Sequence, residues 1–99
     1  MIKVEVTKKC ISILGHANFD DYGKDIVCAA ISSVVITSVE AIASFDKNAI
    51  TIKEETNNLT IIINKRDNIT NNLITNMLNC LKEIEKKYPK NIKITNKEE

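Results

Sequence analysis

The stretch from Asp25 to Phe45 contains no glycine and no proline, and it constrains the fold more than any other part of the chain. Its four alanines favour a helix, whereas Val34-Val35-Ile36 has strand propensity. Length decides between the two, because strands seldom run so far. The sequence therefore predicts one long helix that is apolar on nearly every side. Such a helix needs cover from a sheet, from a second helix and, as a further option, from a second subunit.

Short segments with alternating apolar and polar residues flank this helix and predict strands. The expected strands cover residues 2–6, 11 to about 15, 50–53, 59–63 and 92–94. The run Glu55-Thr56-Asn57-Asn58 is interpreted as a turn. A second helix is indicated by apolar residues spaced three or four apart, namely Leu73, Met77, Leu81, Ile84 and Tyr88. Thr70 or a nearby asparagine is expected to cap its start, and Pro89 to end it.

The expected fold is α+β, with a five-stranded, mostly antiparallel sheet and two helices in the order ββαββαβ. The polar residues of most strands share one parity, so one sheet face is expected to meet solvent. Both helices then cover the other face, which favours two layers over a doubly wound arrangement. A length of 99 residues indicates a single domain, residues 1–99.

Composition excludes several classes of function. A net charge of +1 offers no concentrated basic face for nucleic acid or a membrane surface. The three cysteines are odd in number and widely spaced, so they predict neither a disulfide framework nor a zinc site, and we expect a cytoplasmic protein without metal or cofactor. Serines and Glu40 interrupt the long apolar helix, so a soluble core helix explains it better than a membrane span. No signal peptide is expected, because the first six residues alternate in polarity.

Twelve positions separate the only histidine, His16, from Cys28, and the segment between them is interpreted as a loop joining a strand to the long helix. Cys28 would lie in the first turn of that helix, where the helix field favours a thiolate, and His16 at the strand end is a candidate base. The free N–H groups of the same turn could stabilise an oxyanion. Asp25 would stand at the helix start, and Ser32 one turn beyond the cysteine on the same face.

Each of these residues also has a simpler interpretation. A cysteine in an apolar helix is usually an inert core residue, an aspartate before a helix is usually a cap, and a serine there is usually a packing residue. Cys10 and Cys80 have no histidine near them in sequence and are interpreted as bystanders. Phe19 and Tyr22 either pack the loop down or contact a substrate.

The segments Gly15-His16-Ala17 and Asp25-Ile26-Val27-Cys28-Ala29-Ala30, with Ser32 following, resemble the signature of the bacterial ribosomal-processing cysteine protease family, Prp. The element order and the length of the chain are also similar to that family from end to end. The resemblance implies a cysteine endopeptidase that removes a short N-terminal extension from the ribosomal large-subunit protein L-twenty-seven, cutting after phenylalanine and before alanine or a similar small residue.

By position, the resemblance implies Cys28 as nucleophile and His16 as its base, with Gly15, Asp25 and Ser32 at other motif positions. It also implies a homodimer and a His-to-Cys loop that orders over the substrate. Asp25 either orients His16 or only caps the helix. Two other classes of function are a non-catalytic, ribosome-associated binding module and a thiol-based redox protein, the latter lacking a nearby resolving cysteine.

Overall fold

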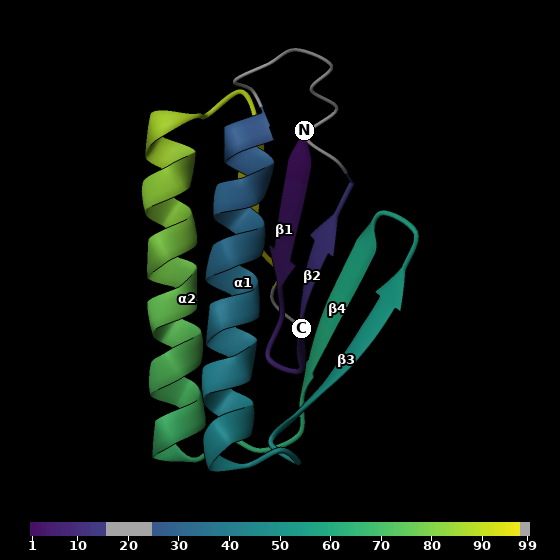
Figure 1. Cartoon of the computed structure of the whole chain (residues 1–99), viewed down its shortest axis with the longest axis vertical. Helices are drawn as coiled ribbons and strands as arrows, with labels where there is room; N and C mark the ends of the chain where they lie inside the picture. The colour runs from purple at the N-terminus through teal and green to yellow at the C-terminus, as the bar shows by residue number, and fades with distance from the viewer. Residues whose placement is uncertain (16–24, 98–99) are drawn as a thin grey trace.

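A computed structural model describes residues 1–15 and 25–97 of the chain (Figure 1). Seven elements follow one another in the order ββαββαβ. They are β1 (Ile2–Val6), β2 (Cys10–Leu14), α1 (Asp25–Phe45), β3 (Ile50–Glu55), β4 (Asn58–Ile63), α2 (Asn68–Lys87) and β5 (Ile92–Asn96). This order and the α+β class were predicted from the sequence, and both are confirmed.

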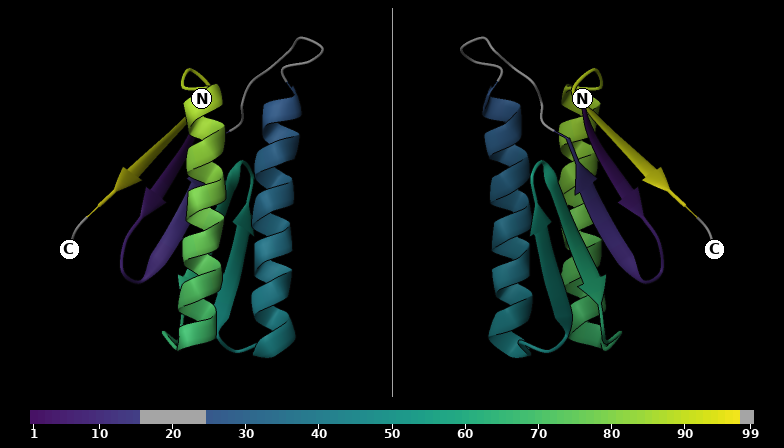
Figure 2. Two further views of the ribbon diagram at one scale, coloured as in Figure 1. Left: turned by 90° about the vertical axis from the view of Figure 1, so that its left-hand side faces the viewer. Right: turned by 90° about the vertical axis from the view of Figure 1, so that its right-hand side faces the viewer.

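The five strands form one sheet in the order β3-β4-β2-β1-β5. Three neighbouring pairs are antiparallel and only β1 and β5 run parallel, so the sheet is mostly antiparallel, as predicted. The two helices lie side by side and cover the same face of the sheet (Figures 1 and 2). The molecule therefore has two layers, and β3 and β5 are the edge strands.

Alternation along the strands decides which side chains form the core, because successive side chains of a strand point to opposite faces. Val4, Ile11, Ile61 and Ile92 are fully or almost fully buried under the helices. Their chain neighbours on the other parity, such as Lys3 and Lys93, are exposed. One face of the sheet thus meets solvent, which agrees with the prediction from strand polarity.

Helix α1 extends over the predicted residues and is only partly covered by the rest of the domain. Val27, Ile31, Val35 and Ile42 are buried at helical spacing in the core. Other apolar side chains of α1 are exposed: Ile26, Ile36 and Phe45, at 54%, 55% and 66%. By length and composition this helix could also cross a membrane. Its buried face belongs to the core of a two-layer domain, so we interpret it as a core helix.

Two local predictions need correction. The N-cap of α2 is Asp67, whose Oδ1 accepts a 2.8 Å hydrogen bond from the backbone N–H of Thr70, so Thr70 is not the cap and lies buried inside the first turn. The connection between β3 and β4 is also shorter than predicted. Both strands continue into the polar run, and only Thr56 and Asn57 remain as the turn. Asn57 has a φ of 61°, a left-handed conformation that asparagine tolerates better than most residues.

Candidate active site

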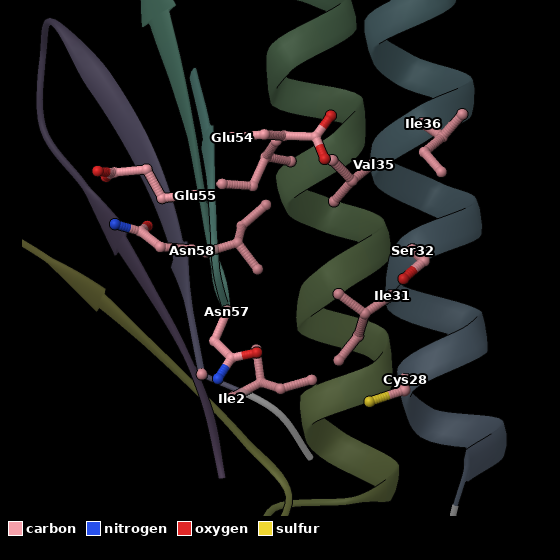
Figure 3. A pocket seen from close by; sticks show the side chains of 13 residues that line it. Ile2, Cys28, Ile31, Ser32, Val35, Ile36, Glu54, Glu55, Asn57 and Asn58 are labelled. Carbon is pink, nitrogen blue, oxygen red and sulfur yellow. The ribbon is translucent and has the colours of Figure 1, made fainter. Parts of the chain in front are cut away.

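Cys28 lies in the first turn of α1, which is the position that the sequence predicted for it. Its side chain is half-buried, and its sulfur carries no disulfide. In Figure 3 the sulfur points from α1 toward the sheet. The first N–H groups of a helix have no partner within the helix, and the helix dipole places partial positive charge at this end. A thiol here can act as a nucleophile next to backbone donors.

The sulfur opens into a groove of about 320 Å³ between α1 and residues of β1, β2, β3 and β4 (Figure 3). Its walls are mainly apolar. They include Ile2, Ile13, Ile31, Val35, Ile36 and Leu59. Polar side chains occur along the rim, from Ser32 on the helix and from residues at and beside the β3–β4 turn. A groove of this size and lining can hold several side chains of a peptide.

Gly15 follows the last residue of β2 and lines the groove. Its φ is +86°, and a Cβ at this position would stand 3.1 Å from the backbone oxygen of Met1. Its backbone N–H donates a 2.7 Å hydrogen bond to the carbonyl oxygen of Asn57. The chain therefore turns here in a conformation that favours glycine, and the turn is attached to the β3–β4 hairpin.

Ser32 lies one turn after Cys28 on α1, and both residues line the groove. Ser32 is exposed, and among the described residues no hydrogen bond joins it to the thiol. The structure thus brings Gly15, Cys28 and Ser32 to one groove. His16, Phe19, Tyr22 and the side chain of Asp25 lie outside the described residues, so their predicted roles stay predictions.

Sequence reasoning missed the contribution of β3 and β4 to the site. Glu54, Asn57 and Leu59 line the groove, although the sequence indicated only a hairpin there. The sequence contained one signal for Glu54. It lies at the same alternate positions as Ile50 and Ile52, so its side chain belongs to the helix-facing side of the sheet.

The two other cysteines lie away from this groove. Cys10 is half-buried in β2, where its sulfur is 3.6 Å from Thr7 Oγ1, and Cys80 is half-buried on α2. Within residues 1–15 and 25–97, no three His, Cys, Asp or Glu side chains gather as a metal site would require. Of the three cysteines, only Cys28 lines the groove.

Comparison with known proteins identifies the family. The sequence model of the family described as Cysteine protease Prp matches residues 1–93. The chain belongs to the Prp cysteine protease family. The ribosomal processing cysteine protease Prp of Staphylococcus aureus is 36% identical over 88 residues, which cover 84% of this chain and 81% of that protein.

Solved structures agree with this family membership. The chain is similar to the crystal structure of an essential ribosomal processing protease Prp from S. aureus with a covalently linked product peptide, with a TM-score of 0.87 and 29% identity over 98% of this chain and all of that one. The S. aureus protease has also been solved with a substrate peptide, with the same TM-score. A Streptococcus mutans structure, at 21% identity and a TM-score of 0.76, shares the fold.

Proposed function

We propose that this chain is an endopeptidase that removes the N-terminal extension of the ribosomal large-subunit protein L-twenty-seven, with Cys28 as nucleophile and His16 as its base. One observation carries the proposal: in a member of a cysteine protease family, the Cys28 thiol opens from a helix N-terminus into an apolar groove. The names of the S. aureus relatives support a ribosomal substrate.

The proposed reaction begins when His16 accepts the thiol proton, or is already paired with the thiolate. The sulfur attacks the carbonyl carbon of the peptide bond, and N–H groups at the start of α1 stabilise the oxyanion. Protonated His16 gives its proton to the leaving amine as the acyl-enzyme forms. The same imidazole then activates the water that hydrolyses the thioester.

The lining of the groove supports cleavage after phenylalanine. Ile31, Val35 and Leu59 offer apolar contacts of the kind that an aromatic side chain prefers. We propose that Phe19 and Tyr22 contribute further aromatic cover to the bound peptide, and that Asp25 and Ser32 support the two catalytic groups.

We also propose a cytoplasmic homodimer. The exposed apolar side chains of α1 support the dimer, because Ile26, Ile36 and Phe45 would leave water if a second subunit covered this helix. Light scattering of the purified protein tests it, with Ile36→Glu as the variant expected to shift the protein toward the monomer. A monomeric wild-type protein would contradict this part.

Incubation of the precursor ribosomal protein with wild-type enzyme and with Cys28→Ala tests the catalytic assignment. The wild type is expected to cut once, after phenylalanine, and the variant not at all. Cys80→Ala is the matched control, because its thiol lies on α2 away from the groove, and it should retain activity. Cleavage by Cys28→Ala would refute the nucleophile, and wild-type binding of the extension without cleavage would favour a binding module.

A further inference from the structure

Glu54 interrupts the apolar series on the helix-facing side of β3. Ile50 and Ile52 precede it at alternate positions, so the three side chains share one face of the strand. Its cross-strand partner on β4 is Leu59, which packs against the core. On this helix-facing side of β3, the third residue is therefore a glutamate, whereas the first two are isoleucines.

The carboxylate of Glu54 faces the groove that contains Cys28. Figure 3 shows its side chain pointing from β3 toward α1, on the side of Val35. Among the described residues, no hydrogen bond or ion pair engages Glu54, and no lysine or arginine lines the groove. The groove thus combines apolar walls with the carboxylate of Glu54, and Glu55 adds a second carboxylate at its rim, while none of the described residues that line it is a cation.

We propose that Glu54 is a specificity-determining residue that binds a lysine or arginine side chain of the peptide substrate. This inference rests on the proposed endopeptidase function. Lysine and arginine have long apolar stems with a charge at the end, so the stem can pack on Val35 and Leu59 while the cation meets the carboxylate. A short polar side chain would make neither the full apolar contact nor the ion pair with Glu54.

The helix sets the distance between this subsite and the bond that is cut. Val35 comes seven positions after Cys28, which corresponds to about 10 Å along α1. An extended peptide advances about 3.3 to 3.6 Å per residue. For a peptide lying along the groove, the cationic residue is therefore about three positions from the scissile bond. Because a lysine or arginine side chain is long, the residue can also lie about one position nearer to the bond or farther from it.

Glu54 has a competing structural explanation. Because β3 is an edge strand, an inward-pointing charge on it would discourage pairing with the edge of another molecule. That role predicts self-association when the charge is removed and no change in the choice of substrate. The two explanations therefore differ in a measurable quantity, the preference between a cationic and a neutral residue in the peptide.

The test uses a set of peptides with one central Phe-Ala bond, in which a single lysine is moved through the positions on both sides. Each peptide is paired with one that carries norleucine, which keeps the apolar stem and lacks the charge. Cleavage by the wild type is expected to be about two- to fivefold more efficient, in kcat/KM, for lysine at one position near the third from the bond, and this ratio should fall at high salt.

Glu54→Gln is expected to bring the lysine-to-norleucine ratio to about one, and Glu54→Lys to favour glutamate at the same position. Glu40→Gln is the matched control. It removes the same charge from an exposed position of α1 that does not line the groove, so the lysine preference should remain.

Binding of the same peptides to Cys28→Ala, followed by fluorescence anisotropy, separates this inference from the proposed function. A lysine preference in binding that Glu54→Gln removes supports the subsite even if the wild type cuts no peptide, in which case only the endopeptidase function fails. Equal ratios for wild type and Glu54→Gln, in cleavage or in binding, would overturn the role of Glu54.

Discussion

The backbone N–H of Gly15 donates a 2.7 Å hydrogen bond to the carbonyl oxygen of Asn57, which connects the last residue before His16 to the β3–β4 turn. Gly15 is also close to the first residue of the chain, since a Cβ there would approach Met1 O. Three separate segments therefore meet at one glycine. This meeting point lies at the groove, because Gly15 and Asn57 both line it.

Gly15→Ala is expected to lower the free energy of unfolding by about 1 to 2 kcal/mol, because an L-residue at φ +86° is strained. The new Cβ would also press on Met1 O, which is backbone and can yield only by moving the chain end. Urea denaturation measures the loss. Asn57→Gly is the control at the other end of the hydrogen bond, and it should change stability by less than about 0.5 kcal/mol, because glycine accepts a positive φ. Equal stability of Gly15→Ala and wild type would contradict the strain.

Asp67→Ala is expected to destabilise the domain by about 1 kcal/mol, because the N–H of Thr70 loses the carboxylate that caps α2. Asp67→Asn keeps an acceptor oxygen in the same place and should recover most of that loss. Thermal unfolding compares the two variants. If both lose the same stability, the cap hydrogen bond is not the cause.

Glu85→Ala is expected to cost about 1 to 2 kcal/mol and to promote self-association through β5. Oε2 of Glu85 accepts a 2.9 Å hydrogen bond from the backbone N–H of Ile94, a donor on the edge strand β5. Glu83→Ala provides the control. Glu83 Oε2 lies 3.6 Å from Lys86 Nζ, and the side chains of Lys86 and Glu83 are 77% and 70% exposed. The loss of this pair should therefore lower the free energy of unfolding by less than about 0.5 kcal/mol. Denaturation and light scattering measure the two effects, and similar results for Glu83→Ala and Glu85→Ala would exclude a special role for Glu85.

Asp46 should make part of the stability depend on acid pH. The hydrogen bond from Lys65 Nζ, 2.7 Å from Oδ2, lowers the pKa of Asp46 below its ordinary 3.8, and the backbone N–H of Asn48 lowers it further. Because this pKa is lower in the folded state, the carboxylate stabilises the fold above the unfolded value. That contribution is lost as the pH falls through the lowered pKa.

The difference in unfolding free energy between wild type and Asp46→Asn should therefore shrink as the pH falls below about 4. Lys65→Met removes the main cause of the shift and should give the same narrowing relative to wild type. Denaturant titrations across the acid range measure both differences. A difference that stays constant to the lowest pH at which the protein folds would show that Asp46 does not titrate as described.

The elements were predictable because the sequence marks them locally. A long segment without glycine or proline specifies α1, and isoleucines and valines at alternate positions specify the strands. The N-cap of α2 was predicted wrongly, because Asp67, Asn68 and Thr70 are all residue types found near helix starts, and local pattern does not choose between them.

Local sequence patterns do not show which distant segments pair with each other. The parallel contact of β1 with β5 joins the two ends of the chain, and no alternation within either strand encodes it. The same limit applies to the groove. Cys28 could be placed from its own helix, but Glu54 becomes part of the site only because the β3–β4 hairpin is long enough to reach the level of Val35 on α1.

Because β1 and β5 are parallel, a tag at the amino end of the chain and a tag at the carboxyl end start at different distances from the groove. Ile2 lines the groove and pairs with Ile92, whereas Asn96 pairs with Val6, about 13 Å further along the sheet. A purification tag or fluorescent label fused before Met1 would begin at the mouth of the groove and compete with a peptide for it. A label that follows β5 would start from the end of that strand opposite to Ile92, so the carboxyl end is the one to modify when activity is to be measured.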